Sequence, residues 1–250
     1  MKDLPVSKAR QHLSCRHHLA VRFFVASSSQ SQYVGPGFRY QLVLEQEHCR
    51  GRQRPAHART SRTAAGNGCH WQVGTQTLKI SFRPLTMSDL DNVVRWSLDR
   101  EVAFWWHESD TPEEDIRSNW ESRARGGDEK TRIFIISLDS TDIGVIQTYR
   151  VVDYPDHMAE LQTDDSAGVD VFIGLPEWRN RGVGSALIRQ FLSEIVFADP
   201  SIQRCVIDPE PDNRRAIRAY ENAGFQHVRS YRSEVNDVDV YLMVRERSAG

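Results

Sequence analysis

A candidate proton acceptor and a candidate anion-binding loop lie close together between residues 168 and 188. Asp170 stands in the middle of a short apolar run, 169–173, which is typical of a buried strand. The loop at 179–184 contains two arginines and two glycines and leads into an amphipathic helix. Glycines let backbone N–H groups approach a ligand, and the first turn of a helix adds N–H donors that have no partner within the helix. The pattern predicts a phosphate-binding loop beside a carboxylate that can accept a proton.

The order of residues in this loop separates it from other phosphate loops. It has neither the Gly-x-x-x-x-Gly-Lys-Ser/Thr of nucleoside triphosphatases nor the Gly-x-Gly-x-x-Gly of dinucleotide-binding proteins. The order Arg179-x-x-Gly182-x-Gly184 instead resembles the pyrophosphate loop of the GNAT acyl-CoA N-acyltransferases, Arg/Gln-x-x-Gly-x-Gly/Ala. Taken alone, the same six residues also fit an ordinary surface turn.

A second block, 205–225, extends the resemblance. It reads as a strand, a polar turn, a helix that Asn213 can cap, and a glycine stop at Gly224. Asn213 and Tyr220 are seven residues apart and therefore lie on one face of that helix. The residues that match the GNAT pattern are Asn213, Ala216, Tyr220, Gly224 and Phe225. Without this context Tyr220 would read as a half-buried packing residue.

Further segments look like those of aminoglycoside 6′-N-acetyltransferases, a branch of the same superfamily. These segments are Gly168-Val-Asp170, Phe172-Ile-Gly174, Ile207-Asp-Pro209, Arg215–Tyr220, Trp105-Trp106 and Ile143–Tyr149. The resemblance covers roughly residues 78 to 246. Lysine-acylating siderophore enzymes share the layout but carry a histidine where this chain has Asp170, which favours the aminoglycoside branch.

Acyl transfer from a thioester to an amine defines the expected catalytic residues. Asp170 is the candidate base for the ammonium proton, because burial in an apolar strand raises the pKa of a carboxyl group; a structural acid bonded to a loop is the alternative. The resemblance implies that Tyr220 protonates the leaving thiolate and that a backbone N–H near Phe172 binds the oxyanion. Serine hydrolase chemistry has no support, since no Gly-x-Ser-x-Gly motif is present.

The resemblance implies acetyl-CoA as the co-substrate and no metal. The expected acetyl-CoA-binding residues are Phe172, Ile173, Arg179, Asn180, Arg181, Gly182, Val183, Gly184, Ser185, Asn213, Ala216 and Tyr220.

A cationic amino sugar is the expected acceptor. Between 151 and 170 the chain has six acidic residues and no lysine or arginine, a field that would attract a polycation, although a solvated loop has the same composition. The expected acceptor-binding residues are Trp105, Trp106, Gln147, Tyr149, Asp153, Asp165, Asp170 and Asp208. Another amine (a siderophore lysine, a polyamine or a protein N-terminus) and a non-catalytic acyl-CoA-binding module are the alternatives.

Charge divides the chain of 250 residues into two parts. Residues 1–77 contain 11 Lys+Arg against 3 Asp+Glu, whereas 78–250 contain 21 against 31. We expect 1–77 to be a poorly ordered basic extension without function, and 78–250 to be the acetyltransferase domain.

Cys15, Cys49 and Cys69 lack the paired spacing of zinc sites, and no apolar run reaches the ~18 residues of a membrane span. We expect a cytoplasmic monomer or homodimer that binds neither nucleic acid nor membrane.

Periodicity and capping signals predict the order of elements from residue 78 onward. Helices are expected at 86–99, 111–125, 182–197 and 214–222. Strands are expected at 78–84, 132–138, 143–152, 169–173, 204–207, 226–231 and 238–246. This β-α-α-β-β-β-α-β-α-β-β order is the α/β layout of the GNAT fold: a twisted, mixed, largely antiparallel sheet flanked by about four helices.

Overall fold

The computed structural model describes residues 70–248, except 74–75, 107–110, 164 and 236. The expectations for 1–69, including those for Cys15, Cys49 and Cys69, lie outside the described residues. The part of the expected extension that is described forms β1 (His70–Val73), which pairs antiparallel with β2 (Gln76–Pro84). Sheet structure therefore begins before residue 78.

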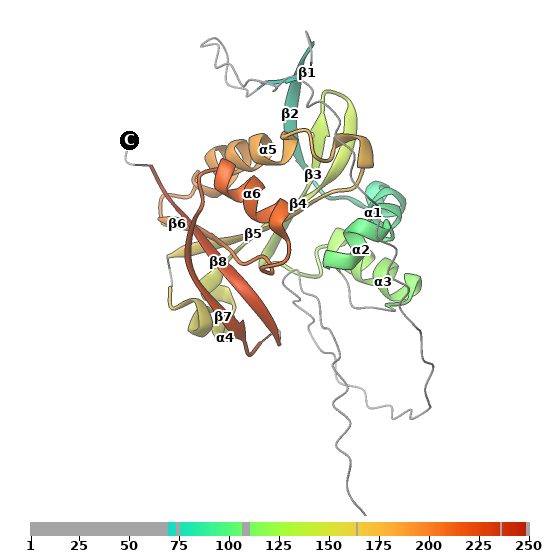
Figure 1. The fold of residues 1–250 in the computed structure, drawn as a ribbon. Coiled ribbons are helices and arrows are strands. Elements are labelled where there is room, and N and C mark those ends of the chain that lie inside the picture. The colour runs from blue at the N-terminus through green and yellow to red at the C-terminus, as the bar shows by residue number, and fades with distance from the viewer. Residues whose placement is uncertain (1–69, 74–75, 107–110, 164, 236, 249–250) are drawn as a thin grey trace, which may run out of the picture.

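One eight-stranded sheet carries the fold, in the order β1-β2-β3-β4-β5-β6-β8-β7 (Figure 1). The remaining strands are β3 (Thr131–Leu138), β4 (Thr141–Arg150), β5 (Ser166–Ile173), β6 (Arg204–Ile207), β7 (Gln226–Ser233) and β8 (Val238–Glu246). Every neighbouring pair is antiparallel except β5 and β6, which are parallel. The mixed, largely antiparallel sheet is as predicted, and β1 is a strand that the prediction did not include.

The described residues contain six α-helices, so the expectation of about four was wrong. The helices are α1 (Leu90–Ser97), α2 (Arg100–Trp106), α3 (Glu113–Ala124), α4 (Pro155–Leu161), α5 (Val183–Phe191) and α6 (Arg214–Asn222). The first expected helix ends early because Asp99 begins a new one: its carboxylate accepts the backbone N–H groups of Glu101 and Val102, as an N-cap does. Helix α4, which starts with a proline, was missed because its acidic surroundings were read as a loop.

Helices cover both faces of the sheet. Phe134 and Ile136 of β3 pack in a core cluster with α5 and α6, whereas Ile133 and Ile135 face a cluster that includes α1 and α3. This alternation follows from the two-residue period of a strand, and a strand that is covered on both faces reads as a nearly continuous apolar run. None of the described helices is long and apolar enough to cross a membrane.

Strands β5 and β6 pair over a short distance only. Ser166, Ala167 and Gly168 of β5 are in register with Arg204, Cys205 and Val206 of β6. Strand β6 ends at Ile207, whereas β5 continues to Ile173. The carboxyl end of β5 is therefore left beside α2, α5 and α6, and this is where the site lies.

Candidate active site

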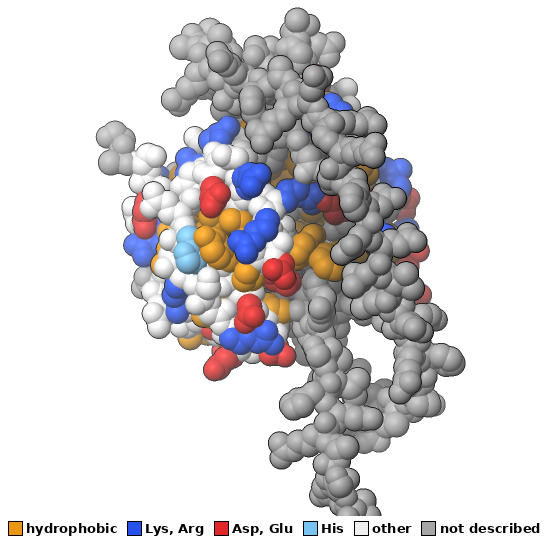
Figure 2. Space-filling model, in the orientation of Figure 1, with side chains coloured by type: hydrophobic (Ala, Val, Ile, Leu, Met, Phe, Trp, Pro, Cys, Tyr) orange, Lys and Arg blue, Asp and Glu red, His pale blue; other side chains and the backbone are white. Residues whose placement is uncertain are grey.

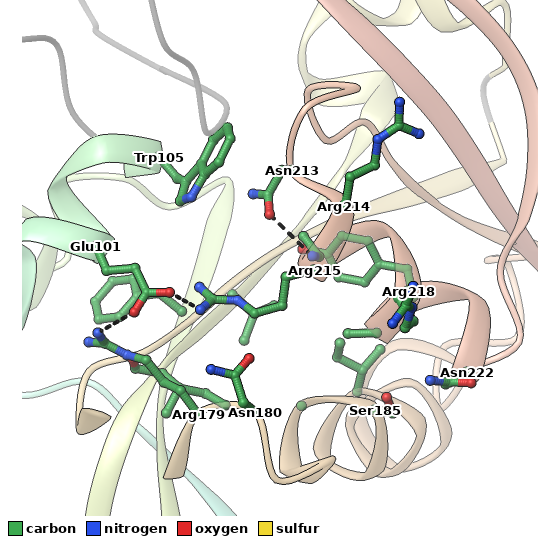
Figure 3. Close-up of a pocket in the computed structure, with 18 of the residues that line it drawn as sticks. Glu101, Trp105, Arg179, Asn180, Ser185, Asn213, Arg214, Arg215, Arg218 and Asn222 are labelled. Atoms are coloured by element: carbon green, nitrogen blue, oxygen red, sulfur yellow. Dashed lines mark hydrogen bonds and ion pairs between the residues drawn. The ribbon is translucent and has the colours of Figure 1, made fainter. Parts of the chain in front are cut away.

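A cleft of about 580 Å³ opens beside the carboxyl end of β5 (Figure 3). It is bounded by α2 on one side, by the start of α5 below and by α6 on the other side. Ten of the twelve expected acetyl-CoA-binding residues line it: Phe172, Ile173, Arg179, Asn180, Gly182, Gly184, Ser185, Asn213, Ala216 and Tyr220. Val183 is fully buried in the core and Arg181 lies over the ring of Trp178, and neither lines the cleft.

The loop before α5 has the backbone that its glycines predict. Gly182 is the N-cap of α5 with a φ of 80°, a left-handed conformation that favours glycine. A Cβ atom added at Gly184, which lines the cleft, would lie in ordinary van der Waals contact with Ala219 at 3.9 Å and would not clash. The first N–H groups of α5 therefore border a space that a phosphate could occupy.

Arg179, the first residue of the loop motif, is engaged with the protein itself. Its side chain is only 7% exposed and donates to the carbonyls of Ile173 and Gly174, at 2.8 Å each. It also forms ion pairs with Asp99 at 2.7 Å and Glu101 at 3.0 Å. Arg179 thus holds the end of β5 against the start of α2, and its guanidinium is engaged by protein groups.

Three arginines on α6 add positive charge to the cleft, and sequence reasoning did not assign them to it. Arg214, Arg215 and Arg218 all line the cleft, and Arg215 forms an ion pair with Glu101 across it (Figure 3). With Arg179, the lining contains four arginines against one acidic residue, Glu101. Basic and acidic side chains also surround an apolar area on the face shown in Figure 2. The cleft thus combines cationic and apolar walls, which suits a ligand with phosphates and a lipophilic arm.

Asp170 is buried on β5 and keeps its proton more readily than an ordinary carboxyl group. Its side chain is opposite Gln147 of β4, whose Nε2 donates to Asp170 Oδ2 at 2.8 Å. Burial raises the pKa of Asp170 to about 7, and the nearby Asp208 carboxylate also raises it; the Gln147 hydrogen bond and the charge of Arg123 act in the opposite direction. Asp170 is thus poised to exchange a proton near neutral pH.

Tyr220 lies on α6 and lines the cleft, although most of its side chain is buried. Burial and the carboxylates of Asp170 and Asp208 raise the pKa of its phenol, so it remains a proton donor over the neutral range. The predicted cap of α6 is confirmed: the Asn213 side chain accepts the N–H of Ala216 at 3.1 Å. This cap fixes the first turn of α6 at the edge of the cleft.

The two expected acceptor-binding tryptophans line the cleft from α2. Trp106 packs edge-on against Phe172 with ring centroids 4.8 Å apart, and Trp105 packs edge-on against Phe104 at 4.7 Å. Trp106 therefore supports the strand end that carries Phe172.

The expected acceptor-binding residues of β4 are buried and bonded within the protein. Gln147 Oε1 accepts from Arg123 at 2.8 Å while its Nε2 donates to Asp170. The Tyr149 hydroxyl lies 3.3 Å from Nε2 of His157, a buried residue of α4. The polar atoms of Gln147 and Tyr149 thus meet protein partners on α3, β5 and α4, and their binding to acceptor hydroxyls stays a prediction.

The acidic residues expected to bind the acceptor do not gather at one place. Asp208 follows β6, and burial raises the pKa of its carboxyl group. Asp153 is in a short 3-10 turn after β4, where its carbonyl accepts from Lys130. Asp165 lies before β5, at the end opposite the cleft, 3.5 Å from Arg204. Of these acids, only Asp208 acts on the charge of Asp170.

Sequence reasoning missed Glu101, Arg123 and Arg215. Arg215 stands inside the motif block, and its position on the cleft face of α6 could have been inferred from the Asn213–Tyr220 spacing. Arg123 belongs to a helix without a motif, and Glu101 lies outside the Trp105-Trp106 segment of its helix, so only the fold brings the two residues to the site. In the described part of the chain, no three His, Cys, Asp or Glu side chains gather as metal ligands would.

Comparison with known proteins agrees with this geometry. The model of a family described as an acetyltransferase (GNAT) domain matches residues 86–232. Aminoglycoside N(6′)-acetyltransferase type 1 of Klebsiella pneumoniae is 29% identical over 150 residues, which are 59% of this chain and 74% of that protein. A kanamycin resistance protein of Rhizobium radiobacter is 40% identical over 68 residues, 27% of this chain and 62% of that one. The solved structure of aminoglycoside acetyltransferase AAC(6′)-Ib with coenzyme A and kanamycin superposes with a TM-score of 0.59 at 28% identity, covering 67% of this chain and 95% of that one.

Proposed function

Since the chain belongs to the GNAT acetyltransferase domain family, we propose that it transfers the acetyl group of acetyl-CoA to the 6′-amino group of an aminoglycoside. The observation that carries this proposal is the position of Asp170, a buried carboxyl group with a pKa of about 7 on the strand whose end lines the cleft. The similarity to aminoglycoside acetyltransferases, one of them solved with coenzyme A and kanamycin, supports the choice of acceptor.

The residues of the cleft fit acetyl-CoA. The N–H groups at the start of α5 and the arginines of α6 provide donors and charge for phosphates. The missing side chain at Gly184 lets phosphates approach the backbone closely, because this residue lines the cleft. When bound, acetyl-CoA supplies a thioester carbonyl, and we expect a backbone N–H near Phe172 to bind its oxygen.

Proton transfer is assigned to two groups, Asp170 on β5 and Tyr220 on α6. Asp170 takes the proton of the acceptor ammonium, directly or through a water molecule, so that the neutral amine can attack. Tyr220 gives its proton to the departing sulfur and remains neutral beforehand because its pKa is raised. Asp208, whose carboxyl is close enough to act on Asp170, provides an acidic group for a second ammonium of the acceptor.

The test is release of free coenzyme A from acetyl-CoA in the presence of kanamycin or tobramycin, with spermidine and lysine as competing amines. The matched control is an aminoglycoside that carries a 6′-hydroxyl group in place of the 6′-amine. Turnover with the amine and none with the hydroxyl analogue supports the proposal. Turnover with spermidine or lysine alone would assign the same chemistry to another acceptor and refute the aminoglycoside assignment.

A further inference from the structure

A chain of three side chains connects helix α3 to the buried carboxylate. Arg123 of α3 donates from Nη1 to Gln147 Oε1 at 2.8 Å, and Gln147 Nε2 donates to Asp170 Oδ2 at 2.8 Å. The three residues belong to α3, β4 and β5, so the fold and not the sequence brings them together. Gln147 and Asp170 are also register partners in the sheet, which keeps the second hydrogen bond short.

The direction of this chain follows from the chemistry of its first member. An arginine side chain has donors and no acceptor, so only the oxygen of the Gln147 amide can face Arg123. The amide is therefore turned with its NH₂ group toward Asp170. A hydrogen bond donated to a carboxylate stabilises its charged form, whereas the opposite amide orientation would place an oxygen against it.

Arg123 is itself held in place by the core below α3. Its guanidinium lies 5.5 Å from the ring centroid of Trp120, and the Trp120 indole N–H donates to Ser97 at 2.9 Å. Trp120 and Ser97 are both buried. Burial lowers the pKa of Arg123, but a guanidinium remains charged at neutral pH. A fixed positive charge thus stands one side chain away from Asp170.

We propose that Arg123 is a positioning residue that acts through Gln147 to orient the Asp170 carboxylate and favour its ionised form. This inference rests on the proposed function in one respect, namely that Asp170 is the base. Without Arg123, burial and the Asp208 carboxylate would act on Asp170 with less opposition, and the base would stay protonated to a higher pH.

The groups that face Asp170 come from several elements and must be considered together. Asp208, after β6, opposes its ionisation, while Arg123 and Gln147 favour it. Tyr149 of β4, Cys205 of β6 and Tyr220 of α6 also feel the Asp170 charge, and burial raises the pKa of each. These three are therefore neutral near pH 7, so the fixed charge of Arg123 is opposed by burial and by the carboxyl group of Asp208, whose own pKa burial raises.

The experiment compares Arg123→Met and Arg123→Lys with Arg125→Met, a matched loss of charge at the exposed end of the same helix, where Arg125 pairs with Glu121. In Arg123→Met we expect the acidic limb of the kcat/KM profile to move up by about one pH unit, with activity regained at alkaline pH. Arg123→Lys keeps a charged donor, so its pH profile should stay close to that of the wild type. Arg125→Met should leave the profile unchanged. A loss of activity that is equal at every pH would indicate a purely structural role and overturn the inference.

A direct titration separates this inference from the proposed function. In protein labelled with ¹³C at aspartate, the Asp170 carboxyl signal is the one lost in Asp170→Asn, and its midpoint requires no acceptor. An unchanged midpoint in Arg123→Met overturns the inference even if aminoglycosides are acetylated. A shifted midpoint supports it even if they are not.

A second variant tests whether the effect passes through Gln147. Gln147→Leu should itself raise the midpoint, and adding Arg123→Met should then produce a smaller shift than in the wild type, since the connecting amide is gone and only the direct effect of the Arg123 charge remains. A full additional shift in the double variant would show that Arg123 acts on Asp170 without Gln147, which contradicts the proposed route.

Discussion

Replacing Asp170 with asparagine should make the protein more stable at alkaline pH while making it a poorer catalyst. Asparagine has the same shape and can still accept the hydrogen bond from Gln147, but it never carries a charge. In the folded protein burial raises the pKa of Asp170 from 3.8 to about 7. Between these two pH values the folded protein holds a proton that the unfolded chain has released.

The sign of the effect follows from this difference in bound protons. The free energy of unfolding falls with rising pH wherever the folded state binds more protons, so the contribution of Asp170 is complete below about pH 4 and is lost by about pH 7. The difference between the pKa values of Asp170 in the unfolded and the folded protein corresponds to about 4 kcal/mol in the free energy of unfolding. Relative to the wild type, Asp170→Asn should therefore gain up to about 4 kcal/mol between pH 4 and pH 8.

Urea unfolding at a series of pH values measures this difference, because other titrating groups cancel between the two proteins. The Asp208→Asn background offers a control: it removes a carboxylate that raises the pKa of Asp170, so the gain should be smaller there. Turnover of Asp170→Asn at pH 8 should fall by about 10²- to 10⁴-fold. A stability difference that does not change with pH would refute the reasoning about burial.

Three further changes address the cleft. Glu101→Gln removes the acidic group that pairs with Arg215, so coenzyme A should bind about fivefold tighter at low salt. Calorimetry should find a smaller gain in affinity at high salt, and weaker binding of coenzyme A would contradict this charge argument. Tyr220→Phe should lower kcat by about 10²-fold while the Kd of coenzyme A stays the same, and an unchanged kcat would remove Tyr220 from proton transfer. Gly184→Val should leave the melting temperature nearly unchanged, since a Cβ there has no neighbour closer than 3.9 Å, but should abolish coenzyme A binding; a protein that still binds would place the phosphates elsewhere.

Most of the sheet was predictable because its signals are local. The nearly continuous apolar run in 132–138 and the glycine stop at Gly224 correspond to β3 and to the left-handed residue after α6. Helix α4 was not predictable in the same way, because three of its seven residues are polar or charged and its apolar members Met158 and Leu161 face a separate small cluster with Val206 and Leu242. Only the presence of the sheet beneath makes that segment a helix.

The site was predictable as far as its residues share a motif. The loop 179–184 and the α6 block meet at one cleft, as expected from their order along the chain. The role of Arg179 was not visible, because its partners Asp99 and Glu101 stand about 80 residues earlier. Gln147 was assigned to the acceptor for a related reason. The alternation of a strand shows on which face of the sheet Gln147 lies, but it does not show that Arg123 of α3 lies on that face and donates to it.

The short pairing of β5 with β6 also has a mechanical consequence. Only three residue pairs join the half of the sheet that ends at β5 to the half formed by β6, β8 and β7. Phe172 on the first half and Ala216 of α6, the helix that follows β6 in the chain, line the same cleft. A ligand in the cleft would therefore contact both halves of the sheet. Its binding free energy would then add to the coupling between the two halves, so that ligand binding should make them unfold more cooperatively.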